Sequence, residues 1–128
     1  MLQDEFYLVY QPQINIKTKK IVGMEVLVRW ENSSLGQVMP DEFIPIAIRE
    51  GLMSEIDRRT LEKACAQLAR WKKLGFISKC CFSINVLPDQ LLSSDFTKAV
   101  KRLIKKNDLK AKDLEFEFLE ANLMGDIK

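Results

Sequence analysis

Three stretches of this chain set polar residues among apolar ones in the way that β-strands do. They are Gly23–Trp30, Cys81–Val86 and Leu114–Glu120. Because successive side chains of a strand point to opposite faces, each stretch presents a defined set of residues on one face. These sets are Glu25, Leu27 and Arg29; Ser83 and Asn85; and Glu115 and Glu117. Whether that face meets water or a protein interior depends on how the strands are connected.

The first part of the chain predicts a hairpin, a loop and a short helix. Phe6–Ile16 is rich in β-forming residues, and Ile21–Trp30 follows at hairpin spacing, so the two strands should be antiparallel. Residues 31–38 are rich in loop-forming types and predict a loop. Pro45 suits the first position of a helix that ends near Gly51.

Hydrophobic periodicity predicts the remaining elements. Apolar residues at helical spacing indicate a long helix from about Ser54 to Leu74, with Ser54 and Asp57 as a capping pair and Gly75 as its stop. The elements predicted beyond it are a strand at 80–86, a helical turn at 88–92, a helix ending near 107, a strand at 114–118 and a helix beginning near 124.

The order of these elements predicts an α/β fold. From Ile21 onward, strands alternate with helices, and crossovers of this length join parallel strands. Parallel sheets are covered on both faces or closed into a barrel. The polar faces of the three strands are therefore expected to point inward.

Composition limits the classes of protein that fit. The 128 residues, 47% of them apolar, suit a single domain over 1–128. A net charge of +2 gives no reason to expect a nucleic acid polymer as partner, and no apolar run reaches the roughly 20 residues of a membrane span. Three cysteines in apolar patterns and no signal peptide point to a cytoplasmic protein with reduced thiols. The absence of histidine excludes a histidine base, triad or metal ligand.

The polar strand faces suggest metal chemistry. Carboxylates and a carboxamide at the ends of adjacent parallel strands would form an oxygen-rich site of the kind that Mg²⁺ or Mn²⁺ prefers. Such an ion can polarise a phosphoryl oxygen and activate water. Arg29 shares a face with Glu25 and could hold a phosphate group.

Each of these features also has a structural explanation. Glu25 could be a solvated strand end, Asn85 could form a turn before Leu87, and Glu115 and Glu117 could face water. A basic stretch near the end of the chain could be a solvated helix face or a partner site. Its residues are Lys98, Lys101, Arg102, Lys105, Lys106, Lys110 and Lys112.

Taken together, a series of short motifs resembles the EAL-domain family, the bacterial phosphodiesterases of cyclic di-GMP. The motifs occur in the family's order and span nearly the whole chain. They are Tyr10–Pro12, Gly23–Trp30, Pro40–Pro45, Glu50–Leu52, Ser83–Val86, Asp89–Leu91 and Glu115–Glu120. The resemblance implies a (β/α)₈ TIM-type barrel with its site at the carboxyl ends of the strands.

The resemblance also implies roles for individual residues. Metal-binding positions of the family match Glu25, Asn85 and Glu117, and a glutamate that helps to hold a neighbouring catalytic loop matches Glu120. Positions that contact the dinucleotide match Gln11, Leu27 and Arg29. With Mg²⁺ or Mn²⁺, the family hydrolyses cyclic di-GMP to linear pGpG by metal-activated water.

The chain departs from the family pattern at three places. Val26 replaces the central residue of the eponymous triplet, but it points away from the site and suits a strand. Leu119 stands where a threonine is usual. The family's D-D-F-G-x-G strand and catalytic lysine have no match, and a full barrel needs about 250 residues. The expected fold is therefore the first half of the barrel, with an antiparallel first strand.

Three functions remain open from the sequence. The leading interpretation is the N-terminal part of a cyclic di-GMP phosphodiesterase domain that is inactive by itself. A degenerate module could instead bind cyclic di-GMP or a protein partner without hydrolysis, and a truncated chain could have no function. Half a barrel would also leave open strand edges, so the chain alone is expected to be marginally stable or to self-associate.

Overall fold

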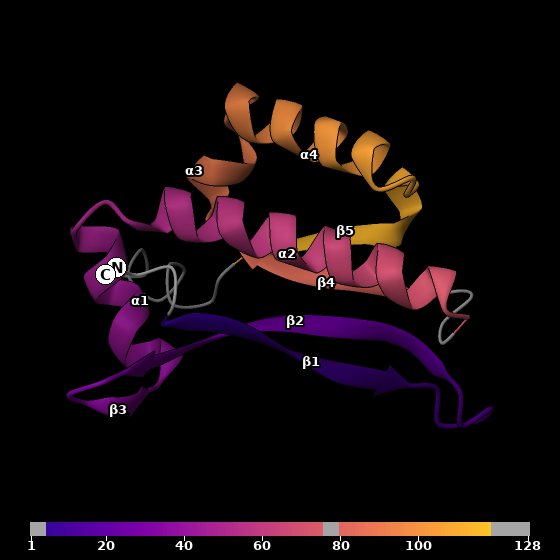
Figure 1. The fold of residues 1–128 in the computed structure, drawn as a ribbon, viewed down its shortest axis with the longest axis horizontal. Coiled ribbons are helices and arrows are strands. Elements are labelled where there is room, and N and C mark those ends of the chain that lie inside the picture. The colour runs from indigo at the N-terminus through magenta and orange to yellow at the C-terminus, as the bar shows by residue number, and fades with distance from the viewer. Residues whose placement is uncertain (1–4, 76–79, 119–128) are drawn as a thin grey trace.

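The computed structural model describes residues 5–75 and 80–118. These residues form a mixed sheet with helices on one side (Figure 1). The elements, in order, are β1 (Phe6–Ile14), β2 (Ile21–Asn32), β3 (Gly36–Val38), α1 (Pro40–Arg49), α2 (Met53–Lys73), β4 (Cys81–Val86), α3 (Pro88–Leu91), α4 (Ser94–Lys106), a 3₁₀ turn (Ala111–Asp113) and β5 (Leu114–Phe118).

The sheet has the order β1-β2-β4-β5, with β3 paired to the far end of β2. β1 and β2 form the expected antiparallel hairpin, and β2, β4 and β5 are parallel neighbours. Each parallel connection passes through a helix, as crossovers in α/β folds do. The predicted strand–helix–strand order is thus confirmed, and the described sheet is open, with β1 and β5 as its outer strands.

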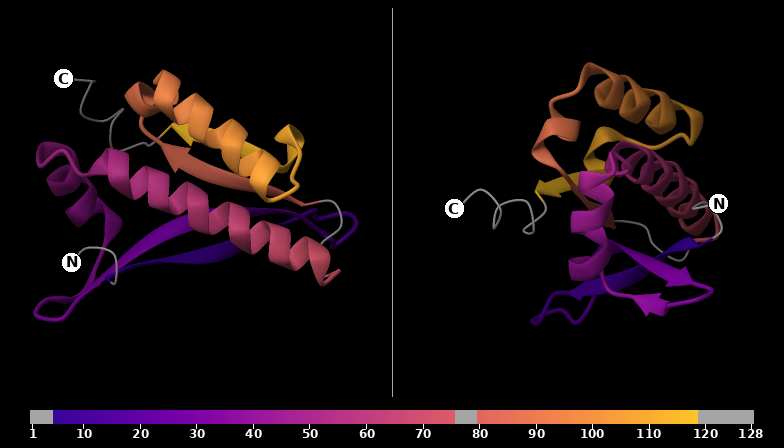
Figure 2. Two further views of the ribbon diagram at one scale, coloured as in Figure 1. Left: turned by 45° about the horizontal axis from the view of Figure 1, so that its top comes forward. Right: turned by 90° about the vertical axis from the view of Figure 1, so that its left-hand side faces the viewer.

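The helices cover one face of the sheet. Figures 1 and 2 show α2 and α4 side by side on the same side of the strands. Their apolar residues pack against strand residues of opposite parity to the polar set, including the fully buried Phe82 and Val86. The polar residues singled out in the sequence therefore lie on the face that these helices leave uncovered. Because burial of the helix-facing side is nearly complete, this parity is strongly specified.

Two predictions for residues 31–50 were wrong. The expected loop contains β3, which pairs antiparallel with the extended end of β2 through Trp30 and Val38. The helix begins at Pro40 rather than Pro45, which lies inside α1. Pro40 occupies the first turn, where a missing N–H costs nothing. Buried Phe43 and Ala47, four residues apart, hold α1 to the core across the internal proline.

The long helix was predicted to within a residue at each end, but its predicted capping pair was wrong. α2 begins at Met53 and ends before Gly75, whose φ of 80° suits the residue after a helix. Ser54 makes no capping hydrogen bond. Asp57 is buried rather than exposed in a capping box. Its burial matters for the site described below.

The cysteines fit their predicted structural role. All three are free, Cys65 and Cys80 are buried, and Cys81 is half-buried. Burial raises the pKa of the Cys65 thiol to about 11, so this thiol stays protonated and behaves as a small apolar side chain. No helix in the described ranges has the length and apolar character needed to cross a membrane. The helix predicted near residue 124 lies outside the described residues.

Candidate functional site

The strand register brings the predicted site residues into two rows across the sheet. Glu25 of β2 lies opposite Gln11 of β1 on one side and Ser83 of β4 on the other. Two positions further along β4, Asn85 lies opposite Glu117 of β5. Because the three parallel strands run in one direction, these residues gather toward their carboxyl ends, where α1 and α3 lie in Figure 1.

Two hydrogen bonds connect residues of neighbouring strands on this face. The Asn85 side-chain amide Nδ2 donates to Glu25 Oε2 at 3.3 Å, a diagonal contact between β4 and β2. The Ser83 hydroxyl donates to Glu115 Oε2 at 3.2 Å. Ser83 is only 2% exposed, whereas Glu25 and Asn85 are half-buried and Glu117 is exposed. Solvent exposure on this face therefore increases from the buried Ser83, through Glu25 and Asn85, to Glu117.

Leu27 and Arg29 continue the same face of β2 beyond the part that pairs with β4, while still pairing with β1. The β2–β4 pairing ends at Val26 and Ile84, although β2 runs on to Asn32. In the described structure, the Arg29 guanidinium donates to the carbonyl oxygen of Val28 at 3.2 Å. Its charge is not neutralised by that contact, so Arg29 keeps the capacity to hold a phosphate near Glu25.

These residues suit a hard divalent cation in type but supply only part of a coordination sphere. Glu25, Asn85 and Glu117 offer carboxylate and carboxamide oxygens, which Mg²⁺ and Mn²⁺ prefer. Across residues 5–75 and 80–118, no three Asp, Glu, His or Cys side chains cluster closely enough to hold a metal by themselves. The carboxylates of Glu25 and Glu117 and the carboxamide of Asn85 could therefore supply some of the ligands of a metal site, but not a complete coordination sphere. Glu120, predicted beside them, lies outside the described residues.

A buried carboxyl group that the sequence did not mark as functional lies close to this face. Asp57 of α2 is 4% exposed and lines a cavity of about 100 Å³ together with Leu27, Arg29 and Asn85. Burial raises the pKa of Asp57 to about 7, while a hydrogen bond with the backbone of Leu87 acts in the opposite direction. The helical pattern offered a signal for this burial, because Asp57 lies four residues from Met53 and from Leu61 and therefore on the buried face of α2.

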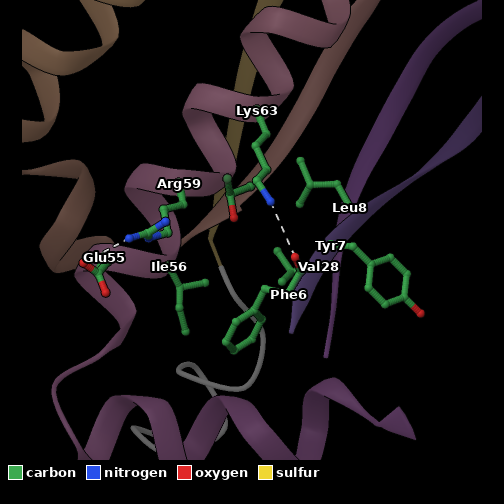
Figure 3. Close-up of a pocket in the computed structure, with 9 residues that line it drawn as sticks. Phe6, Tyr7, Leu8, Val28, Glu55, Ile56, Arg59 and Lys63 are labelled. Carbon is green, nitrogen blue, oxygen red and sulfur yellow. Dashed lines mark hydrogen bonds and ion pairs between the residues drawn. The ribbon is translucent and has the colours of Figure 1, made fainter. Parts of the chain in front are cut away.

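A second pocket lies on the opposite, helix-covered side, between β1 and α2 (Figure 3). Phe6, Leu8 and Ile56 provide apolar walls. Figure 3 shows Lys63 reaching the carbonyl oxygen of Phe6, at 3.5 Å, and Arg59 facing Glu55. Its volume of about 20 Å³ is close to that of one water molecule, so this pocket is a packing gap rather than a ligand site.

Comparisons of the sequence with known proteins identify a matching family and similar proteins. The sequence profile of the EAL domain matches residues 1–128. A cyclic di-GMP phosphodiesterase of Pseudomonas aeruginosa, PA2567, is 37% identical over 97% of this chain. The match covers 21% of that protein, so the chain spans about a fifth of the length of this curated relative.

Solved structures give the same result for the fold. The PaMucR phosphodiesterase in complex with c-di-GMP matches with a TM-score of 0.82 and 25% identity, over 89% of this chain and 46% of that one. The EAL enzyme Bd1971 in its cGMP-bound form matches with a TM-score of 0.81 and 31% identity, over 95% of this chain and 35% of that one. The expected fold, a partial (β/α)₈ barrel with an antiparallel first strand, is confirmed.

Proposed function

The chain belongs to the EAL domain family, and we propose that it forms the N-terminal part of a domain that hydrolyses cyclic di-GMP to linear pGpG. The observation that supports this most directly is the contact between Asn85 and Glu25, with Glu117 opposite Asn85 in the register. Three oxygen-bearing side chains from three adjacent parallel strands thus meet on one face.

The proposed roles follow from where each side chain lies. Glu25, Asn85 and Glu117 would hold Mg²⁺ or Mn²⁺, which would polarise a phosphoryl oxygen and lower the pKa of a bound water. Arg29 would hold a phosphate of the dinucleotide beside Glu25. Gln11 lies opposite Glu25 on β1 and Leu27 follows it on β2, so both would contact the nucleotide near the metal. Glu120, beyond the described residues, is proposed to support a neighbouring catalytic loop.

The hydrogen bond between Asn85 and Glu25 suggests how the site is kept ready. Donation from Asn85 Nδ2 occupies one oxygen of Glu25 and orients the carboxylate within the sheet. The same bond fixes the Asn85 side chain, whose carbonyl oxygen is then available on the uncovered face. Preorganised ligands of this kind reduce the entropy that metal binding must overcome.

The test is hydrolysis by a hybrid in which this chain is followed by the C-terminal half of the EAL domain of PA2567. We expect pGpG production with Mg²⁺ or Mn²⁺, abolished by Glu25→Ala and nearly unchanged by Val26→Ala. Glu25 lies on the site face, whereas Val26 is buried against the helices. Product is measured by chromatography, and circular dichroism confirms that each variant folds. Equal loss from both substitutions in folded protein would contradict the assignment.

A non-catalytic module that binds cyclic di-GMP is the second candidate. It is favoured by Leu119, which stands where a threonine is usual in the EAL pattern. The same hybrid separates the two functions, since a binding module would retain the dinucleotide in equilibrium dialysis without forming pGpG.

A further inference from the structure

A group of basic residues meets at the end of the fold opposite the candidate site. The sequence left open whether the basic stretch between Lys98 and Lys112 is a solvated helix face or a partner site. In the structure, the carboxyl ends of α2 and α4 line one hollow of about 600 Å³, on the side away from α1 and α3 (Figure 1). Its basic lining residues therefore come from two parts of the chain that are distant in sequence. They are Arg70, Lys72 and Lys73 of α2 and Lys106 of α4.

A second hollow adjoins the first at Lys72. It has a volume of about 380 Å³ and lies at the amino ends of β4 and β5, where Cys81 and Asp113 are among its lining residues. Lys72 pairs with the Asp113 carboxylate at 2.8 Å, and the backbone amide of Lys110 donates to the same oxygen at 2.8 Å. These contacts hold the segment before β5 beside α2, and Lys110 and Lys112 line the hollow there. The residues that line the two hollows are called the basic surface below.

The basic surface carries more positive charge than the helix ends and its own carboxylates neutralise. Six of the chain's 20 basic residues and two of its 18 acidic residues line it, so its formal charge is +4 and that of the remaining chain is −2. The carboxyl ends of α2 and α4 offset about one of these charges, since each helix end is equivalent to about half a negative charge. Among residues 5–75 and 80–118, five of the six basic side chains make no ion pair. They are Arg70, Lys73, Lys106, Lys110 and Lys112.

The chemistry of the basic surface fits a short acidic peptide. Five of the six cations are lysines, and within the described part of the chain no aromatic residue lines either hollow. Single-stranded nucleic acids are bound by aromatic side chains on which bases stack, and phosphates by the paired N–H groups of arginine. The net negative charge of the remaining chain would repel a long polyanion. The buried Leu109 and half-buried Ala69 give the larger hollow some apolar lining, which suits the methylene groups of glutamate side chains.

We propose that the basic surface docks an acidic peptide segment of a partner protein. Carboxylates of the segment would pair with Lys73 and Lys106 in the larger hollow and with Lys110 and Lys112 in the smaller one. The basic surface lies at the amino ends of the strands and the candidate site toward their carboxyl ends, so the docking does not depend on the proposed hydrolysis. The attraction acts between exposed charges and should therefore weaken in salt.

The test measures binding of fluorescein-labelled octaglutamate to the 128-residue chain by fluorescence anisotropy. We expect saturable binding in about 50 mM NaCl, at least about fivefold weaker binding in about 300 mM NaCl, and no binding of octaglutamine. The double variant Lys73→Gln/Lys106→Gln should bind about fivefold more weakly, the change expected for two exposed ion pairs. The matched control is Lys98→Gln/Lys101→Gln, which removes two exposed charges of α4 outside both hollows and should bind as wild type does. Circular dichroism confirms that both variants fold.

A second readout locates the bound peptide. A carbodiimide cross-linker joins a carboxylate to a neighbouring lysine as an amide, so it marks the lysines that the peptide contacts. Mass spectrometry should find octaglutamate on Lys106, Lys110 and Lys112. Coupling to Lys98 and Lys101, which are exposed on the same helix as Lys106, should be at least about fivefold lower.

Several results would overturn the proposal. No binding of octaglutamate in low salt would do so directly, and equal weakening by the two double variants would show only a general attraction to positive charge. Tighter binding of octathymidylate at the same lysines would assign the basic surface to a nucleic acid instead. Should Lys73→Gln/Lys106→Gln not fold, the coupling pattern of wild type decides, and even coupling to Lys98, Lys101 and Lys106 contradicts the docking. None of these results changes the expected production of pGpG by the hybrid.

Discussion

The buried carboxyl group of Asp57 should make the stability of this chain depend on pH between about 5.5 and 7.5, a range in which the chain has no histidine to titrate. Burial raises the pKa of Asp57 from its ordinary 3.8 to about 7 in the folded chain. Between these two values the folded state keeps a proton that the unfolded state has released. Lowering the pH from 7.5 to 5.5 therefore raises the free energy of unfolding.

The size of the effect follows from that difference in pKa. One pKa unit corresponds to about 1.4 kcal/mol, so complete protonation would contribute about 4 kcal/mol. The part that falls between pH 7.5 and 5.5 is about 2 kcal/mol. Asp57 is 4% exposed, so solvent screening removes little of it. Its pKa is shifted by burial and the Leu87 contact alone, with no charged side chain among the causes.

The measurement is urea unfolding of wild type and Asp57→Asn at both pH values, followed by circular dichroism. Wild type should gain about 2 kcal/mol on acidification, whereas Asp57→Asn should change by less than about 0.5 kcal/mol, because its amide does not titrate. The background is low, since the chain has no histidine. The ion pair of Asp113 with Lys72, at 2.8 Å, lowers the pKa of Asp113 and thus acts below this window. Equal pH dependence in the two proteins would refute the reasoning.

Two further predictions concern the 128-residue chain without added parts. It should produce no pGpG from cyclic di-GMP with Mg²⁺ or Mn²⁺, because catalytic groups acting as a unit lose most of their rate when several are missing; chromatography showing ordinary turnover would contradict this. It should also self-associate, because β1 and β5 are outer strands of the described sheet, and sedimentation at several concentrations would detect it. A stable monomer at every concentration would be evidence against open edges.

Local patterns were sufficient to predict most of the elements. α4 begins after Ser93, which accepts hydrogen bonds from the backbone of Asp95 and Phe96, and it ends at Lys106, within a residue of the limit that its apolar spacing indicated. β5 was predicted with the correct limits from alternation alone. These elements are specified by residues close together in the sequence, and so hydrophobic periodicity predicts them.

The elements that were missed depend on partners distant in the sequence. β3 has only three residues, too few for a visible alternation, and exists because β2 extends far enough to pair with it. The burial of Asp57 is a different case. Asp57 lies four residues from the buried Met53 and Leu61, so helical spacing places it on the buried face of α2, although its residue type suggested an exposed cap. Propensity is a weak guide wherever tertiary contacts decide.

The candidate site lies between these two cases. Alternation correctly predicted that Glu25, Asn85 and Glu117 share a face. It did not predict which of them touch, because Glu25 pairs in register with Ser83 and reaches Asn85 only diagonally. That contact requires β4 to remain extended through Asn85, beyond the last residue that pairs with β2. The part of β4 beyond its pairing with β2 therefore determines whether Asn85 reaches Glu25, and Asp57 of α2 lines the cavity beside it.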